Sequence, residues 1–303
     1  MLKDPNDPRF IDLIQPRDKP QRDGYALLGV PFDGAVLGRK GARDGPKAIR
    51  ECFRFYSVYD WDRDFELTTP IFDFGNLEFS VTSIEAAHTQ VTEEVQKIRR
   101  LGLHPIIMGG DHSITYAAVK AINTSKRLGI INFDAHLDLR ETYEQISSGT
   151  PFRRLIDEEI IAPQDLVEIG LQNFKNAKLY RTFAENNGIC TIPLSQIRSQ
   201  GIQSTIDIIS HQLFANVEDV WISIDIDVVD QGYVPGVSNP SSYGMTPWEI
   251  VDIIRQIATH KKCIGMDLVE TSPQHDLQGT TANLAAYLII QFIASHEYGK
   301  SNF

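Results

Sequence analysis

The chain has 303 residues, 42% of them hydrophobic, with a formal net charge of -11 and a pI near 5.2. This length and composition allow a large hydrophobic core, and the acidic balance argues against a general nucleic-acid-binding protein, which needs a basic surface. The sequence shows no long apolar span, no signal-peptide pattern and no basic run suited to a membrane surface. We therefore expect a cytoplasmic protein that has neither nucleic-acid nor membrane partners.

The first segment, MLKDPNDPRF, is polar and interrupted by prolines, which predicts an N-terminal arm over residues 1–20. No repeat or low-complexity stretch divides the remainder, so we predict a single α/β domain over residues 1–303. Cys52, Cys190 and Cys263 show no paired spacing, which predicts free thiols.

Apolar, strand-like runs alternate with helical patterns along the chain. Strands are predicted at Tyr25–Val30, Ile71–Phe74, Pro105–Met108, Leu128–Phe133, Leu166–Leu171, Cys190–Leu194, Val220–Asp225 and Cys263–Leu268. Helices are predicted at Pro46–Phe55, Ile84–Leu101, Ile114–Ile122, Ala177–Asn186, Ile202–Leu213, Pro247–Thr259 and Thr281–Ser295. This alternation favours a three-layer αβα sandwich around a mainly parallel sheet of about eight strands.

Three of the predicted strands end in acidic or imidazole side chains. The sequences concerned are IIMGGDHS at 106–113, LGIINFDAHLDLRE at 128–141 and DVWISIDIDVVD at 219–230. In an open parallel sheet, ligands bind where strands leave their carboxyl ends, so side chains distant in sequence can converge there. The D-x-H-x-D triplet alone also fits an ordinary polar strand end with capping aspartates. The candidate ligands are His112, Asp134, His136, Asp138, Asp225 and Asp227.

Charge balance favours a metal site over unrelated caps. Four carboxylates in one crevice would repel each other and raise one another's pKa, unless cations lay among them. Two divalent ions would neutralise four aspartates, and oxygen-rich ligation with two imidazoles suits manganese better than zinc. Two such ions about 3.5–4 Å apart can activate a shared water near neutral pH.

Gly109 and Gly110 would allow a tight turn before His112, and the proline-containing segment Tyr233–Tyr243 would form one wall of the crevice.

Six segments, in order along nearly the whole chain, resemble the signatures of the ureohydrolase family, which comprises arginases, agmatinases and formimidoylglutamases. The segments are GVPFDG (29–34), GARDGPKAIRE (41–51), GGDHS (109–113), NFDAHLD (132–138), SIDIDVVD (223–230) and GMDLVE (265–270). The resemblance implies an arginase-like fold and a hydrolase with two Mn²⁺ ions per subunit. It implies that one ion is held by His112, Asp134, Asp138 and Asp225, and the other by Asp134, His136, Asp225 and Asp227.

Glu270 ends the GMDLVE segment, and its carboxylate would face the same crevice. A carboxylate there can hold a cationic amidine or guanidine over the metals through charged hydrogen bonds. The resemblance implies this substrate-binding role for Glu270; the alternative is a cap for Thr271 and Ser272. Asp138 is a reasonable proton carrier, and Asp267 is a candidate partner of a metal ligand.

The segment SSGTPF at 147–152 departs from the agmatinase pattern. It carries Ser148 where agmatinases have a histidine thought to shuttle protons, and which group replaces that histidine is left open. Formimidoylglutamases resemble this chain in having serine there and in the AH-x-DLR sequence at 135–140. GLQNFKNAKLY at 170–180, which includes Asn173, is similar to the segment that contacts the distal end of the substrate, and it lacks the aspartates of arginases.

Formimidoylglutamate carries two carboxylates, which a bidentate arginine meets better than a lysine. Arg140 is the candidate contact, with Arg153 or Lys175 as possible helpers; the alternative for Arg140 is an ion pair with Glu141 or Glu144. We therefore predict an amidine hydrolase that converts formimidoylglutamate and water to glutamate and formamide, as in histidine degradation.

Other interpretations of the sequence stay open. They are an agmatinase or guanidinobutyrase that releases urea, a catalytically silent metal-binding member of the family and, more weakly, a one-zinc deacetylase of the same general fold. The resemblance also implies a homo-oligomer, a trimer or hexamer.

Overall fold

The computed structural model describes residues 4, 6–17, 22–80, 83–122, 126–142 and 145–302. Within these ranges a nine-stranded, entirely parallel sheet has the order β1–β5–β2–β6–β11–β10–β7–β8–β9. Its strands are β1 (Ile14–Pro16), β2 (Tyr25–Gly29), β5 (Ile71–Asn76), β6 (His104–Met108), β7 (Leu128–Phe133), β8 (Leu166–Leu171), β9 (Cys190–Pro193), β10 (Asp219–Asp225) and β11 (Cys263–Val269). A small antiparallel hairpin joins β3 (Tyr59–Asp60) and β4 (Phe65–Glu66).

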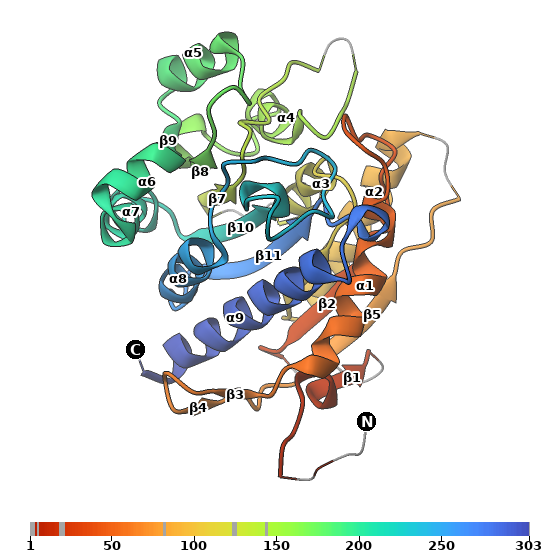
Figure 1. Ribbon diagram of the computed structural model, residues 1–303. Helices are drawn as coiled ribbons and strands as arrows, with labels where there is room; N and C mark the ends of the chain where they lie inside the picture. The colour runs from red at the N-terminus through yellow and green to blue at the C-terminus, as the bar shows by residue number, and fades with distance from the viewer. Residues whose placement is uncertain are drawn as a thin grey trace.

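Helices cover both faces of the sheet, which confirms the predicted αβα sandwich (Figure 1). One face is packed by α1 (Gly45–Cys52), α6 (Leu194–Gln200), α7 (Ile202–Ile209), α8 (Pro247–Ile257) and α9 (Thr280–Asn302). The other is packed by α2 (Ile84–Arg100), α3 (Ile114–Ala121), α4 (Pro151–Asp157) and α5 (Lys178–Asn187). No helix of the described part of the chain is long and apolar enough to cross a membrane.

The central strands are apolar because both of their faces are covered. Along β7, Ile131 and Phe133 pack into one hydrophobic layer, while Ile130 packs into the other. Parallel sheets covered on both faces require such continuous apolar runs. The strands β6, β11, β10 and β7 are neighbours, so their carboxyl ends meet at one edge of the sheet and place the polar residues that follow them together.

The segment predicted to be an N-terminal arm contributes to the sheet where the structure describes it. Ile14–Pro16 forms the edge strand β1, which pairs in parallel with β5. Phe10, in a short 3-10 helix before it, is fully buried. Residues 1–3, 5 and 18–20 of the predicted arm lie outside the described residues. The prediction of a single domain over residues 1–303 stays a prediction.

Candidate metal centre

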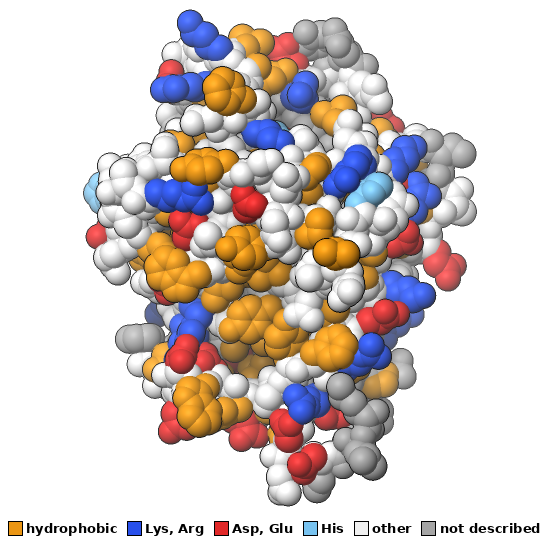
Figure 2. Space-filling model, viewed as in Figure 1, with side chains coloured by type: hydrophobic (Ala, Val, Ile, Leu, Met, Phe, Trp, Pro, Cys, Tyr) orange, Lys and Arg blue, Asp and Glu red, His pale blue; other side chains and the backbone are white. Residues whose placement is uncertain are grey.

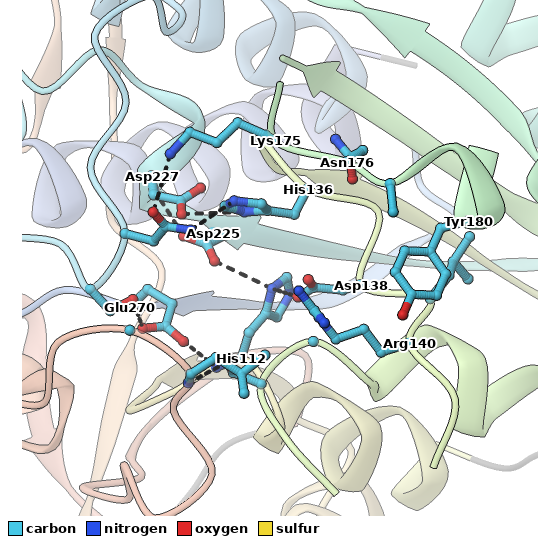
Figure 3. Close-up of a pocket in the computed structure, with 18 residues that line it drawn as sticks. His112, His136, Asp138, Arg140, Lys175, Asn176, Tyr180, Asp225, Asp227 and Glu270 are labelled. Carbon is cyan, nitrogen blue, oxygen red and sulfur yellow. Dashed lines mark hydrogen bonds and ion pairs between the residues drawn. The ribbon is translucent and has the colours of Figure 1, made fainter. Parts of the chain in front are cut away.

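His112, which follows β6, points into a group of carboxylates from two other strand ends. Its Nδ1 atom lies 2.9 Å from Asp138 Oδ2, 3.2 Å from Asp134 Oδ2 and 3.4 Å from Asp225 Oδ2. His112 and Asp134 are fully buried, and Asp225 is 4% exposed. Figure 3 shows His112, Asp138 and Asp225 turned toward one space. The predicted convergence of these four residues is therefore present.

His136 forms a second group beside the first. Its Nδ1 atom lies 3.1 Å from Asp134 Oδ1 and 3.4 Å from Asp227 Oδ2. The ligand atoms of His112, Asp134 and Asp225 lie within 4.8 Å of one another, as do those of Asp134, His136 and Asp138. Asp134 belongs to both groups, so the geometry offers two adjacent positions for a cation with a shared carboxylate.

The capping interpretation applies to Asp225, which begins the 3-10 helix Ile226–Val228, but not to Asp134, because residues 134–142 contain no helix. Asp134 Oδ1 accepts a hydrogen bond from the His136 backbone N–H at 2.7 Å, and Asp225 Oδ1 accepts one from Asp227 N–H at 2.9 Å. These bonds fix each carboxylate by one oxygen. Each Oδ2 is left facing His112, which is the orientation that a shared metal ligand needs.

The tautomer of His112 is set by Ser223 on β10. The Ser223 hydroxyl donates its hydrogen to Asp267 Oδ1 at 2.6 Å, so its oxygen is free to accept from His112 Nε2–H at 3.1 Å. A neutral imidazole with a proton on Nε2 presents a lone pair on Nδ1. Among the described residues, that buried Nδ1 has no hydrogen-bond partner, and neither have Asp134 Oδ2 and Asp227 Oδ1. Three orphaned acceptor atoms around one space fit a cation.

Without cations the site is electrostatically unfavourable. Burial raises the pKa of Asp225 well above its usual range, and the nearby Asp227 and Asp134 carboxylates raise it further. Burial likewise raises the pKa of Asp227 to about 8, and Asp134 and Glu270 add to this shift against the opposing charge of His136. Divalent ions among these groups would reverse both shifts, because a positive charge favours the ionised carboxylate.

Glu270 follows β11 and closes the same space. Its Oε1 atom accepts from the His112 backbone N–H at 2.9 Å, and its Oε2 atom accepts from the Ser238 hydroxyl. Burial, Asp225 and Asp111 all raise the pKa of Glu270.

Glu270 and Asp138 have left-handed backbones with φ of 66° and 46°. Such conformations are costly for residues other than glycine and cluster at functional sites.

A cavity of about 410 Å³ opens over the metal-ligand candidates. Arg140, Ser148 and Lys175 line it. Arg140 and Ser148 are predicted substrate contacts, and Lys175 is the residue considered as a helper of Arg140. The Arg140 guanidinium lies 5.8 Å from the Tyr180 ring centroid. It has no ion pair with any described residue; Glu141 lies 3.7 Å from Arg153 instead, and Glu144 is outside the described residues.

Two predicted substrate contacts do not lie at the cavity. Arg153 is on α4, where its Nε donates to Asp157 at 2.9 Å and its guanidinium packs on the Phe183 ring. Asn173 is exposed and lines a neighbouring depression. The residue of that segment that reaches the cavity is Asn176, which accepts from Leu137 N–H at 2.8 Å.

The glycine-containing segments 29–34 and 41–51 support the candidate metal centre at the end of β6. A Cβ at Gly110 would lie 1.7 Å from the Phe32 carbonyl oxygen, so only glycine allows this approach of the 29–34 segment to the end of β6. Neither Gly109 nor Gly110 has a positive φ. The chain does bend at Gly110 before His112, as predicted, but this bend needs no positive φ, and what requires glycine at Gly110 is space. Asp33 accepts from Gly41 N–H at 2.9 Å and from Arg43 Nε at 2.6 Å, joining the two motifs.

Several residues of the site were not singled out from the sequence, although four of them lie in the segments 170–180 and 233–243, which were expected to contact the substrate and to form a wall of the crevice. They are Ser223, Asn176, Tyr180, Ser238 and Asn239. Ser223 carries the one usable signal, because a polar side chain two positions before Asp225 on an apolar strand lies on the same face. The other four lie in loops or at the start of a helix, where the spacing of residues in the sequence does not predict the direction in which a side chain points.

Fold and site together define a class: a doubly covered, parallel α/β protein with a carboxylate and imidazole centre suited to two divalent ions. The sequence profile of the arginase family matches residues 23–294. Formimidoylglutamase from Bacillus subtilis (strain 168) is 32% identical over 95% of this chain and 92% of its own length. The mitochondrial agmatinase of Gallus gallus is 31% identical over 88% of this chain and 79% of its own.

The solved structures agree with this classification. The crystal structure of formimidoylglutamase from B. subtilis superposes with a TM-score of 0.94 at 30% identity, covering 100% of this chain and 95% of that one. The chain belongs to the arginase family. The predicted resemblance to ureohydrolases, and to formimidoylglutamases in particular, is confirmed.

Proposed function

We propose that this protein is a two-manganese formimidoylglutamase, which hydrolyses formimidoylglutamate to glutamate and formamide. The observation that carries the proposal is the make-up of one cavity. The carboxylate cluster and Glu270 form its floor, and the cations Arg140 and Lys175 line its walls. The formimidoylglutamases and the similarity of fold described above support the same assignment.

The residues that would hold the ions divide as the resemblance implies. His112, Asp138, Asp134 and Asp225 would hold one ion, since the three carboxylates lie within 3.4 Å of His112 Nδ1. His136, Asp227 and the two shared aspartates would hold the other, and Asp134 and Asp227 lie within 3.4 Å of His136 Nδ1. Their eight carboxylate oxygens and two imidazoles suit manganese. Bound there, such ions supply Lewis acidity that lowers the pKa of water toward neutrality.

The protein's own groups position the substrate and move protons. Glu270, fixed through both oxygens, would hold the cationic formimino nitrogen and keep the formimino carbon over the floor of the cavity. Water adds to that carbon, and the bond to the glutamate nitrogen breaks. Asp138, which is 12% exposed at its side chain and therefore reaches the cavity, would carry the water's proton to the departing glutamate amine.

The charge of the walls selects the substrate. Figure 3 shows Lys175 on the His136 and Asp227 side of the cavity and Arg140 on the Asp138 side. Two cations on two sides match the two carboxylates of formimidoylglutamate. The cationic tail of agmatine would meet two like charges. Ser148, which accepts from Leu37 N–H at 3.2 Å, holds the 35–38 segment against the cavity and has no titratable group to replace the missing histidine.

The decisive assay measures formamide and urea separately. Manganese-reconstituted protein is given formimidoylglutamate, agmatine, guanidinobutyrate and arginine in turn. We expect formamide from formimidoylglutamate and little urea from the other three. Urea release from agmatine or guanidinobutyrate as the main activity would replace the proposal by an agmatinase or guanidinobutyrase. Bound manganese without turnover of any amidine would replace it by a silent family member.

We also propose a homo-oligomer that acts in cytoplasmic histidine degradation. Support for self-association comes from the surface, where Figure 2 shows hydrophobic side chains gathered over α8, α9 and the β3–β4 hairpin. Trp61, 83% exposed, and Trp248, 69% exposed, are large examples. A trimer or hexamer stays a prediction, as does the cellular location.

A further inference from the structure

Arg140 lies in a groove that the missing side chain of Gly149 leaves in the cavity wall. A Cβ at Gly149 would lie 2.6 Å from Arg140 Cδ and 2.9 Å from Arg140 Nε, with Leu37 Cδ1 at 3.2 Å. The Arg140 backbone N–H donates to the Gly149 carbonyl at 2.9 Å, so the two segments are also joined through their backbones. The side chain of Arg140 therefore runs directly over the backbone of Gly149.

Tyr180 gives the Arg140 guanidinium a second contact. The guanidinium carbon lies 5.8 Å from the centroid of the Tyr180 ring, within the range of a cation–π interaction, which extends to about 6 Å. Tyr180 is half-buried in the first turn of α5, and Figure 3 shows it beside Arg140, whose side chain extends toward Asp138. An arginine held in this way loses little conformational entropy when it binds an anion.

The hydrogen-bond donors of Arg140 and Tyr180 are unused, although both residues line the cavity. Within the described part of the chain, neither the Arg140 guanidinium nor the Tyr180 hydroxyl has a hydrogen-bond or ion-pair partner. Lys175, which lines the same cavity, already donates to Asn239 Oδ1 at 3.1 Å and to the Pro240 carbonyl at 3.0 Å. A guanidinium and a phenol hydroxyl are both suitable donors for a carboxylate.

Gly149 is not required by the conformation of its own backbone. Its φ is not positive, so an alanine can adopt the same conformation. The three atoms that its Cβ would approach most closely all belong to the side chains of Arg140 and Leu37. An alanine therefore displaces the arginine side chain and leaves the surrounding backbone in place. This separates a role in holding Arg140 from a role in the fold.

We infer that Gly149 and Tyr180 determine substrate specificity by holding Arg140 as a receptor for one carboxylate of the substrate. The guanidinium pairs with that carboxylate, and the Tyr180 hydroxyl donates a hydrogen bond to it as well. Gly149 is a positioning residue, because it acts through Arg140, whereas Tyr180 touches the substrate. This inference rests on the proposed function, since it takes the substrate to be an anionic amidine.

Gly149→Ala tests the groove. The probe is glutamate, the proposed product, titrated by calorimetry into the Mn²⁺-loaded full-length protein. We expect its affinity to fall about tenfold, because the arginine no longer lies where the carboxylate binds. The KM for formimidoylglutamate should rise by about the same factor, while kcat changes less than about twofold, because the groups at the reacting carbon are untouched.

Arg140→Met is the matched background, because it removes the guanidinium and keeps an unbranched apolar side chain. In that background, titrated to higher glutamate concentrations, Gly149→Ala should change the glutamate affinity less than about twofold. Manganese content and the midpoint of denaturant unfolding are measured for each variant, which shows whether it is folded and loaded.

Tyr180→Phe tests the hydroxyl, because phenylalanine keeps the ring beside the guanidinium. We expect glutamate affinity to fall about tenfold, the size of effect of one hydrogen bond to a charged group. Tyr233→Phe is the matched control, because Tyr233 is 50% exposed and is not among the described residues that line the cavity. It should bind glutamate as the wild type does.

Equal losses from Gly149→Ala in the wild-type and Arg140→Met backgrounds would overturn the inference, because the loss would not pass through Arg140. Unchanged affinity in Gly149→Ala or Tyr180→Phe, or no binding of glutamate by the wild type, would overturn it too. Formamide release is measured on the same wild-type preparation. Formamide release without the expected losses of affinity counts against the receptor alone, whereas those losses without formamide release count against the proposed function alone.

Discussion

Ser223 has one hydroxyl hydrogen, and the acceptor of that hydrogen determines which nitrogen of His112 faces the candidate metal centre. Asp267 takes that hydrogen, and Asp267 is itself fixed because Trp221 Nε1 donates to its other oxygen at 2.6 Å. Thr115 of α3 donates to Asp267 as well, at 2.9 Å. Asp267 therefore orients His112 through Ser223, which supports its predicted role as a partner of a metal ligand.

Removal of this hydroxyl should weaken metal binding. In Ser223→Ala, His112 loses the acceptor that keeps its proton on Nε2, so we expect Mn²⁺ affinity to fall by about 10–100-fold. Calorimetric titration with Mn²⁺ at fixed pH measures this. Ser241→Ala is a matched control, because Ser241 is also buried but its hydroxyl has no hydrogen-bond partner in the part of the chain that the structure describes. Wild-type Mn²⁺ affinity in Ser223→Ala would show that the tautomer of His112 is set by something else.

The metal-ligand candidates could be predicted at the residue scale, whereas the distal contacts could not. Asp134 directly follows β7 and Asp225 is the last residue of β10, so the sheet sets their direction, and His136 lies two positions after Asp134. Asn173 and Arg153 lie beyond the strand ends, where the direction of a side chain depends on how each loop packs. Phe174, with a φ of 64°, reverses the chain after Asn173 and brings Asn176 to the cavity instead.

At the scale of elements, the close approach of the 29–34 segment to the end of β6 supports the position of His112. Phe32 O accepts from Asp111 N–H at 2.8 Å, and Asp111 Oδ2 accepts from Ala35 N–H at 2.8 Å. These bonds form only if the two backbones touch, which the missing side chain of Gly110 allows.

Gly110→Ala should therefore damage both stability and metal binding. Its Cβ would lie 1.7 Å from a backbone oxygen, so the two segments must separate. We expect a loss of about 2–4 kcal/mol in the free energy of unfolding, in the range of severe core substitutions. Denaturant unfolding and manganese content are the measurements. Gly232→Ala is the control, because the nearest atom that its Cβ would meet is the Asp230 side chain at 3.1 Å. Equal stability of the two variants would contradict this role for Gly110.

The elements themselves were predictable in proportion to their length and burial. All eight predicted strands are present, because central strands of a covered parallel sheet are apolar throughout. Five strands and α-helices were missed, namely the three-residue edge strand β1, the two-residue strands β3 and β4, and the seven-residue helices α4 and α6. Such short segments show less than two full helical turns or one strand alternation, which is too little for a periodic pattern.

At the scale of the whole molecule, titratable groups at the two ends of the sheet contribute to the free energy of unfolding with opposite dependence on pH. Asp225, Asp227 and Glu270 at the candidate metal centre have raised pKa values. Near the opposite end of the sheet, burial lowers the pKa of His296 on α9 to about 2, with His104 and Lys300 adding to the effect. Tyr25 donates to Glu297 at 2.7 Å, so its oxygen can accept from His296 Nδ1–H at 2.8 Å.

A buried neutral histidine contributes stability that is complete above its unfolded pKa of about 6.5 and is lost as pH falls toward its folded pKa. The carboxylates with raised pKa values change the stability in the opposite sense as pH falls. The difference in unfolding free energy between wild type and His296→Gln therefore isolates the contribution of the histidine. This difference in unfolding free energy should shrink by roughly 1.4 kcal/mol between pH 7.5 and 5.5. Denaturant unfolding of metal-free protein at both pH values measures it. A difference that is constant with pH would show that His296 does not bind a proton on unfolding.

Four aspartates and two histidines gather at one edge of the sheet, where we propose that two divalent cations balance the charge of the carboxylates. A crystal structure of the manganese-loaded protein with anomalous data tests this most directly. We predict two anomalous peaks about 3.5–4 Å apart, one beside His112 Nδ1 and the other beside His136 Nδ1, with Asp134 and Asp225 between them. A single peak, or none at saturating manganese, would contradict the account.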